Sequence, residues 1–192
     1  MEFVAGPGER VHLFLPGRRR AGEALTLKVT LTDRYRNTPP DRSPMDTNWD
    51  LVLLGPAGER LLPRDGWTGL DRHRLAVPLG ALSPGVYRVE AHRPGSGELV
   101  ARSNALEVMP PGDSRPPVHW GEIHTHSEMS DGRGRYDTLH RHARDEGALD
   151  FVSAADHLAS TSDNDWRRMQ EIANRYDDPG RFATLIGYEY GG

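Results

Sequence analysis

In the first half of the chain, apolar and polar residues alternate in short runs, which is the pattern of half-buried β-strands. Successive side chains of a strand point to opposite faces, so a period of two gathers the apolar residues on one face. The clearest run covers residues 24–31, where one face carries Leu25, Leu27, Val29 and Leu31. Turn sequences rich in glycine and proline separate similar segments at residues 10–15, 49–54, 73–78, 85–92 and 105–109. About six or seven such strands predict an all-β, immunoglobulin-like sandwich over residues 1–109.

A proline-rich segment at residues 110–117 interrupts this pattern. Its sequence, Pro-Pro-Gly-Asp-Ser-Arg-Pro-Pro, suits neither a helix nor the interior of a sheet, because proline lacks a backbone donor and fixes its own φ. We therefore expect a linker here, which would separate the sandwich from a second domain at residues 118–192.

In residues 118–192 the pattern changes to strands that alternate with helices. Strands are predicted at residues 118–124, 149–155 and 182–188, and helices at residues 136–147 and 163–176. The first helix should end at Gly147 in a left-handed cap, and the second should begin at Ser162 or Asp163. This β-α-β-α-β order implies parallel strands joined by right-handed crossovers, so that the C-terminal ends of the strands lie along one edge.

Candidate metal ligands follow each of these three strands. His124 and His126 are two residues apart on an extended segment, so their imidazoles leave the same face. Asp131 lies in a Ser-Asp-Gly turn that can bring its carboxylate back toward them. Asp156 and His157 follow the second strand, where the carboxylate could orient an imidazole. Glu189 follows the third strand.

Each of these features also has an ordinary structural interpretation. Two histidines near a strand end can be polar rim residues, Ser-Asp-Gly can be a simple turn, and Glu189 can be a surface residue. The predicted topology, however, brings all of them to one edge of one sheet. Their joint placement therefore favours a metal site at the strand ends.

Composition restricts the chemistry of such a site. The chain has no cysteine, so any metal would be held by imidazole and carboxylate, which suit zinc, iron or manganese. A formal net charge of −4 argues against a nucleic-acid partner. No apolar run approaches the ~18 residues that span a bilayer, and no secretory signal is visible, so neither a membrane nor an export step is expected and a cytoplasmic location follows.

Other polar residues near the site have weaker assignments. Arg133 and Arg135 follow the turn and could hold a substrate anion, although such arginines are more often solvated. Ser127 and Ser130 lack the base and orienting group of a serine nucleophile. His140 and His142 lie about 200° apart on the predicted helix and cannot share an ion. We expect both to be surface residues.

Taken together, these motifs resemble the first three motifs of the PHP (polymerase and histidinol phosphatase) superfamily, and particularly its uncharacterised amidohydrolase-related branch. The resemblance covers about residues 118–192 and rests on His124-Thr125-His126 with Ser130-Asp131-Gly132, Asp156-His157 and Gly187-Tyr188-Glu189. It implies a distorted β/α barrel of about seven strands. An all-β segment often precedes the metal domain in that branch.

The resemblance also implies a function. A complete site would hold two or three divalent ions, Zn, Mn or Fe, and would hydrolyse phosphate esters or related bonds of a small phosphorylated substrate. The implied ligands are His124, His126, Asp131, His157 and Glu189. Asp156 would orient one of these ligands without contacting the ion.

The sequence departs from the family pattern in one important respect. Later histidines and a final Asp-X-His have no counterpart, and only three strands of about seven are present. We therefore expect the chain to be the N-terminal part of a longer metal-dependent hydrolase and to be inactive alone. The alternative is a non-catalytic binding protein, in which the β-sandwich carries the function and the barrel is truncated or decayed.

Overall fold

The computed structural model describes residues 5–39, 48–69 and 74–190. The chain forms two compact units, Met1–Val118 and His119–Gly192, and β-strands predominate among the described elements. Within the described residues, no helix is both long and apolar enough to cross a membrane.

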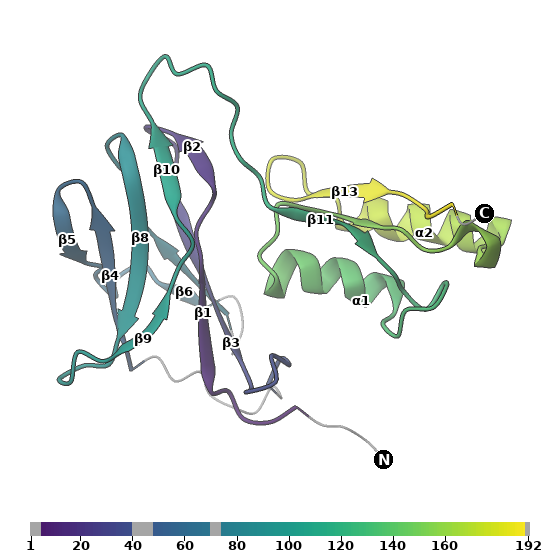
Figure 1. Cartoon of the computed structure of the whole chain (residues 1–192), viewed down its shortest axis with the longest axis horizontal. Coiled ribbons are helices and arrows are strands. Elements are labelled where there is room, and N and C mark those ends of the chain that lie inside the picture. The colour runs from purple at the N-terminus through teal and green to yellow at the C-terminus, as the bar shows by residue number, and fades with distance from the viewer. Residues whose placement is uncertain (1–4, 40–47, 70–73, 191–192) are drawn as a thin grey trace. The chain divides into compact units, whose positions relative to one another are not determined.

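The first unit contains two β-sheets (Figure 1). One sheet is antiparallel throughout, and its strands are, in spatial order, β1 (Arg10–Phe14), β3 (Thr26–Thr32), β7 (Arg74–Pro78) and β6 (Thr68–Gly69). The strands of the other sheet are, in spatial order, β2 (Arg18–Arg20), β10 (Leu106–Met109), β8 (Gly85–His92), β4 (Asp50–Gly55) and β5 (Gly58–Leu61). A further strand, β9 (Leu99–Arg102), pairs with β8. Within this second sheet, β2 and β10 are parallel.

One continuous apolar core joins the two sheets of this unit. Leu27 and Val29 on β3 and Leu51 and Val89 on the opposite sheet are completely buried within it. The alternation in residues 24–31 is thus confirmed as a strand whose apolar face supplies the core. Burial of apolar surface is the main stabilising contribution to folding, so this unit carries its own source of stability.

The predicted strands of the first unit correspond to β1, β3, β4, β7, β8 and β10. The predicted segment at residues 73–78 begins with His73, which lies outside the described residues. Four short strands were not predicted, namely β2, β5, β6 and β9. The first of these has the sequence Arg-Arg-Arg and the second is exposed along its whole length. Neither shows the apolar alternation on which the prediction depended.

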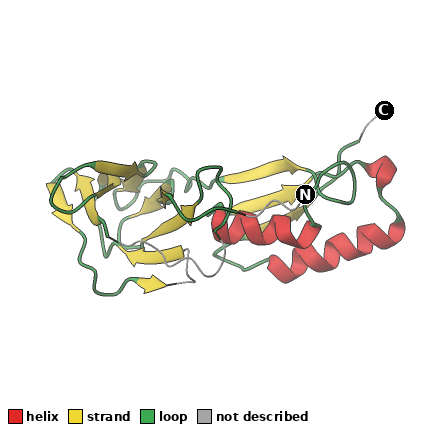
Figure 2. Cartoon of the chain, turned by 90° about the horizontal axis from the view of Figure 1, so that it is seen from below, coloured by secondary structure: helices red, strands yellow, loops and turns green. Residues whose placement is uncertain are grey.

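The second unit is a three-stranded parallel sheet with helices on one face. The strands β11 (Gly121–Thr125), β12 (Phe151–Ala154) and β13 (Ala183–Ile186) lie in chain order, so the predicted parallel arrangement is confirmed. Figure 2 shows the helices on the same face of this sheet. That placement follows from two successive crossovers of the same hand in the same direction. Val152 and Ala154 of β12 are buried beneath the helices.

The second α-helix has the predicted boundaries. Helix α2 (Asp163–Tyr176) is capped by Ser162, whose hydroxyl accepts a hydrogen bond from the Asp165 amide. The Asp165 side chain in turn accepts one from the Ser162 amide. This reciprocal arrangement satisfies two donors that a helix start otherwise leaves unpaired.

The end of the first helix differs from the prediction. Helix α1 (Tyr136–Arg141) continues as one wider π-helical turn, η1 (His142–Glu146), in which the Gly147 amide donates to the His142 carbonyl. The predicted left-handed cap at Gly147 is wrong, because Gly147 has φ −71° and Ala148 takes φ 54°. The wider turn moves the left-handed position one residue along the chain, onto a residue with a Cβ. A short 3-10 turn, η2 (Leu158–Ser160), follows β12.

A candidate metal centre at the strand ends

The β-pairing continues beyond the named strands and brings the candidate residues together. Just past β12 and β13, His157 and Glu189 form a parallel bridge. The Glu189 amide donates to the Asp156 carbonyl at 3.0 Å, and the Leu158 amide donates to the Glu189 carbonyl at 3.0 Å. The backbone itself therefore fixes His157 beside Glu189, at the edge where β11 delivers His124 and His126.

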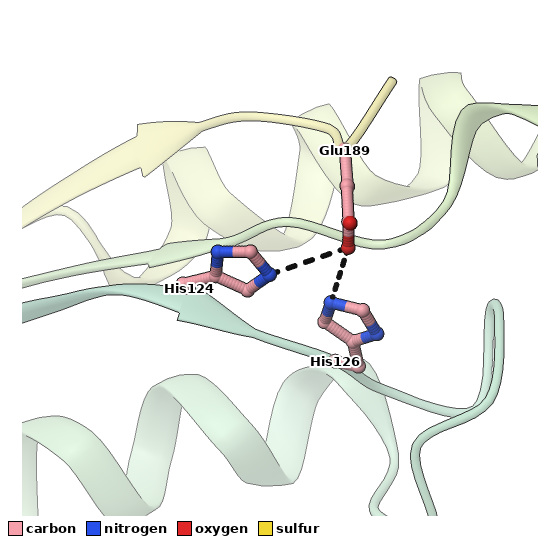
Figure 3. A group of neighbouring side chains, drawn as sticks. All are labelled: His124, His126 and Glu189. Carbon is pink, nitrogen blue, oxygen red and sulfur yellow. Dashed lines mark hydrogen bonds and ion pairs between the residues drawn. The ribbon is translucent and has the colours of Figure 1, made fainter. Parts of the chain in front are cut away.

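Three imidazole nitrogens meet at one carboxylate oxygen. Glu189 Oε2 lies 3.2 Å from His124 Nε2 and 3.1 Å from His126 Nε2, as Figure 3 shows. His157 Nδ1 lies 3.6 Å from the same oxygen. The rings of His124 and His126 are stacked, with 10° between their planes, whereas the His157 ring meets that of His126 edge-on. A single acceptor cannot give three imidazoles a good hydrogen bond each, so this convergence requires another explanation.

Asp131 closes the opposite side of the same cluster. Its Oδ1 lies 2.5 Å from His126 Nδ1, and its Oδ2 lies 3.6 Å from His157 Nε2. Two overlapping ligand groups result, one of His124, His126 and Glu189 and one of His126, Asp131 and His157. We refer to them as the first and second ligand groups.

The two nitrogens of His126 have different surroundings. Nδ1 faces the Asp131 carboxylate, which favours the tautomer with a proton on Nδ1 and a lone pair on Nε2. Nε2 is buried and has no hydrogen-bond partner among the described residues, although Glu189 Oε2 lies 3.1 Å away. We interpret that short contact as two acceptor atoms held side by side. A buried nitrogen lone pair next to a carboxylate oxygen is an arrangement that a cation would complete.

Electrostatics couples His126 to Asp131. The hydrogen bond with Asp131 raises the pKa of His126, and the charges of Asp131, Glu189 and Asp156 add to this effect against the opposing effect of burial. The same hydrogen bond lowers the pKa of Asp131. The opposite directions of the two pKa shifts show that the His126 and Asp131 side chains are electrostatically linked.

The Asp156 carboxylate has partners other than the expected imidazole. It is completely buried. Its Oδ1 accepts hydrogen bonds from the Ser127 amide at 2.7 Å and the Ser130 hydroxyl at 2.6 Å, and its Oδ2 accepts one from the Ser127 hydroxyl at 2.8 Å. Asp156 thus binds the turn that carries Asp131, not the ring of His157.

Glycine is required at the end of this turn. The Gly132 amide donates to the Ser127 carbonyl at 2.9 Å, and a Cβ on Gly132 would lie 2.2 Å from the His126 carbonyl oxygen. No side chain fits in that space. The sequence motif Ser-Asp-Gly is therefore a turn that folds back onto the segment bearing His126.

The structure brings together all five predicted ligands, but it does not join the predicted arginines to them. Arg135 Nε lies 3.3 Å from the Asp137 carboxylate, and Arg133 is exposed. The roles of Ser127 and Ser130 were missed, because a hydrogen bond between residues 26 or 29 positions apart leaves no local pattern. Spacing alone could not have revealed these bonds.

One of the two helix histidines is not a surface residue, which corrects the prediction. His140 is completely buried, and its ring packs against those of Tyr136 and Tyr176. Its position four residues after Tyr136, on the face shared with Leu139 and Ala143, was the available signal. His142 is exposed and pairs with Glu146 at 2.9 Å, as expected for the other side of the helix.

Comparison with known proteins gives a family match for the second unit. Residues 119–192 match the model of a family described as a protein of unknown function (DUF3604). The matched region contains every residue of the two ligand groups.

The chain is also similar to two chlamydial proteins that are named only as uncharacterised. The protein of Chlamydia pneumoniae is 22% identical over 189 residues, which cover 96% of this chain. The protein of Chlamydia muridarum (strain MoPn / Nigg) is 19% identical over 187 residues, or 95% of this chain. In each case, the chain spans 29% of the length of the relative. The similarity includes both structural units.

Proposed function

We propose that the second unit binds divalent cations and forms part of a PHP-type metal-dependent hydrolase that acts on phosphate esters. The observation that carries the proposal is the meeting of three imidazole nitrogens at Glu189 Oε2, within 3.1–3.6 Å. Imidazole and carboxylate are the ligands that zinc, iron and manganese share.

The distances between these atoms suit ligands of a common ion. Two ligand atoms at about 2.1 Å from a tetrahedral ion lie about 3.4 Å from each other. The nitrogen-to-oxygen distances of the first ligand group, 3.1 and 3.2 Å, and the contact of 3.6 Å from His157 fall around this value. The buried lone pair on His126 Nε2 supports the same interpretation, because it lacks any other partner among the described residues.

Each residue has a separate role in this proposal. His124 would be a neutral ligand and Glu189 the anionic ligand of one cation. Asp131 and His157 would hold a second cation, and His126 would bridge the two as an imidazolate, with Nε2 on the first cation and Nδ1, after loss of its proton, on the second. The cations would supply Lewis acidity, which lowers the pKa of water and neutralises charge on a leaving oxygen. Arg133 and Arg135 would contact the phosphate, because guanidinium groups bind its oxygens in pairs.

The topology of the second unit supports a PHP-type barrel as its fold. Parallel strands in chain order, with helices on one face and candidate ligands at the C-terminal strand ends, are the arrangement of β/α barrels. Exposed apolar side chains on the sheet, such as Leu185, agree with a strand layer that is normally covered on both faces. This chain spans 29% of the length of the matched relatives. The hydrolase activity of the whole protein is therefore part of the proposal.

We further propose an immunoglobulin-like fold for the first unit. The orders β1-β3-β7-β6 and β4-β8-β10 correspond to the ABED and CFG sheets of that architecture. Strand β4 occupies the position of strand C, and Trp49, the residue just before it, is buried. Immunoglobulin domains also have a buried tryptophan on strand C. The Tyr87 hydroxyl, near the start of β8, donates to the Ser83 carbonyl at 2.8 Å, as in a tyrosine corner. These contacts support the architecture without a disulfide.

Hydrolysis of chromogenic substrates tests the proposed activity. The protein would be supplied with Mn²⁺, Zn²⁺ or Fe²⁺ and given p-nitrophenyl phosphate or bis(p-nitrophenyl) phosphate. We expect the hydrolysis rate of the His124→Ala/His126→Ala double variant to fall more than about 100-fold. Even residues that only hydrogen-bond to metal ligands contribute about 10- to 100-fold to activity in such sites. His142→Ala is the matched control, since this exposed histidine pairs only with Glu146 in the described contacts. Equal rates in the double variant and the parent protein would refute the proposal.

A further inference from the structure

The turn that carries Asp131 is hydrogen-bonded to the buried carboxylate of Asp156. Asp156 accepts three hydrogen bonds, and all three donors belong to Ser127 and Ser130. A buried carboxylate needs such donors, because its loss of hydration is otherwise costly. Hydrogen bonds that involve a charged or acidic acceptor are also shorter and stronger than those between neutral groups. The three bonds therefore form a strong anchor between β12 and the turn.

The turn has few other means of fixing the Asp131 side chain. Backbone bonds from Ser130 and Gly132 to the Ser127 carbonyl, at 3.2 and 2.9 Å, make the turn compact. They set its internal shape but do not tie it to β12. The Asp131 side chain is 68% exposed, and the contacts described for it, apart from Ser130, are with the histidines of the candidate centre. Met129 of the turn also packs against the cluster that includes Ala154 of β12, so the position of Asp131 relative to His157 depends on the anchor together with this packing.

The first ligand group takes no ligand from the turn and is linked to it through the contact of His126 Nδ1 with Asp131. His124 belongs to β11, and Glu189 is fixed by backbone bonds to Asp156 and Leu158. His126 precedes the turn. Only the second ligand group, through Asp131, takes a ligand from the segment that the anchor positions.

We propose that Ser127 and Ser130 are positioning residues for the second cation, which they serve by fixing the Asp131 turn to the buried carboxylate of Asp156. The inference rests on the proposed function, because it assumes that the second ligand group binds a cation. It gives the two serines a role that requires neither of them to touch substrate. It also predicts that the two ligand groups can be separated experimentally.

Calorimetric titration with Mn²⁺ tests this separation. In the Ser127→Ala/Ser130→Ala double variant, we expect affinity at the second ligand group to fall about 10- to 100-fold, the usual effect of losing a partner behind a metal ligand. Affinity at the first ligand group should change less than about threefold. The single variant Ser130→Thr keeps a hydroxyl at position 130 and should retain binding at the second group. Equal losses at both groups would overturn the inference.

Ser153→Ala is the matched control. Ser153 is also a buried serine of this sheet, but its hydroxyl donates to the Ala154 carbonyl and not to the turn. Both Mn²⁺ affinities should be retained in this variant. Selective weakening of the second group by Ser153→Ala would show that any buried hydroxyl has the same effect, and would overturn the specific role of the anchor.

Hydrogen exchange in the absence of metal separates a failure of this inference from a failure of the proposed function. We expect the amides of residues 130 and 132 to exchange at least about tenfold faster in the double serine variant, because the turn opens locally more often when only the residue 127 amide still bonds to Asp156. Should the parent protein bind no Mn²⁺, the proposed function fails, while the exchange rates still test the anchor. Unchanged exchange at both amides in the double variant would overturn the inference whether or not Mn²⁺ binds.

Discussion

The two units of this chain differ in how they use their apolar residues. The first unit encloses its apolar side chains between two sheets, in a core that includes the completely buried Leu51. The second unit has two small apolar clusters and leaves apolar residues of its sheet exposed, with Leu185 at 48%. The main structural feature of the first unit is thus a closed apolar core, whereas that of the second is a polar cluster at the strand ends.

Buried polar groups show the same contrast. In the first unit, the Tyr87 hydroxyl donates to the Ser83 carbonyl. In the second unit, Tyr136 is completely buried, yet its hydroxyl has no hydrogen-bond partner among the described residues, and neither has Nε2 of the neighbouring His140. Burial and the charge of Asp156 raise the pKa of Tyr136 to about 12, so this hydroxyl stays protonated. The second unit therefore tolerates buried side-chain groups without a hydrogen-bond partner, and the described residues of the first unit contain none.

The largest expected effect comes from truncating one leucine in each unit. Leu51→Ala should lower the free energy of unfolding of the first unit by about 2–5 kcal/mol, because it leaves a cavity in a closed core. Leu185→Ala should change the free energy of the second unit by less than about 0.5 kcal/mol, since its side chain is already half exposed. Hydrogen exchange followed by mass spectrometry measures each unit separately. A larger loss for Leu185→Ala would contradict the comparison.

Removing a single tyrosine hydroxyl should change the free energy of unfolding less, and the two units should respond differently. Tyr87→Phe should destabilise the first unit by about 1 kcal/mol, because the Ser83 carbonyl loses its donor. Tyr136→Phe should leave the stability of the second unit unchanged or raise it by up to about 1 kcal/mol, because it removes a buried group without a partner. The same exchange measurement applies. If Tyr136→Phe is the more harmful change, its hydroxyl has an important partner.

A glycine at position 148 should stabilise the second unit slightly. Ala148 adopts φ 54° after the π-helical turn, and the left-handed conformation costs a residue with a Cβ about 1 kcal/mol. Ala148→Gly relieves this cost but gives more freedom to the unfolded chain, so we expect a net gain of a few tenths of a kcal/mol. Ala105→Gly in the first unit is a control outside the left-handed region and should not stabilise. A loss of stability in Ala148→Gly would refute the prediction.

The smallest expected change concerns Asp33 in the first unit, whose stabilising contribution is present at neutral pH and is lost in acid. Burial raises the pKa of this carboxyl, but hydrogen bonds from the Asn37 side chain and from the amides of Gly6, Asn37 and Tyr35 outweigh it and lower the pKa to about 2. A pKa below the unfolded value of 3.8 means that ionised Asp33 stabilises the folded state above about pH 4. This contribution should disappear as the pH falls toward 2.

Thermal unfolding of the parent protein and of Asp33→Asn measures this contribution. The difference in Tm between the two proteins should be constant above about pH 4 and should shrink between pH 4 and pH 2, because Asp33 becomes protonated in the parent protein. Other carboxyl groups titrate equally in both proteins and cancel in the difference. A Tm difference that stays constant down to pH 2 would contradict the assigned role.

Much of the fold was predictable from regular patterns. The period-two alternation of residues 24–31 predicted β3, and the alternation of strand and helix signals predicted the parallel order of β11, β12 and β13. Helix α2 has the predicted boundaries because its capping serine is adjacent in sequence. The end of α1 could not be predicted, because a π-helical turn depends on packing and carries no sequence signal that distinguishes it from an ordinary α-helical turn.

The candidate site shows the same limit of local information. The predicted ligands His124, His126, Asp131, His157 and Glu189 lie together, since parallel topology brings strand ends to one edge. What escaped prediction is the contact between Asp156 and the two serines, which depends on how a turn folds back over a neighbouring strand. The buried position of His140 was missed because both helix histidines were assigned to the surface once their angular separation ruled out a shared ion, without regard to the packing of each one.

The most direct test of the central claim is the number of Mn²⁺ ions that the protein binds, measured by equilibrium dialysis with elemental analysis. We predict about two ions per chain, one for each ligand group. His126→Ala should lose both, because His126 is shared by the two groups, while His142→Ala should keep both. Absence of stoichiometric Mn²⁺ in the parent protein, or its full retention in His126→Ala, would contradict the assignment of a metal centre to these strand ends.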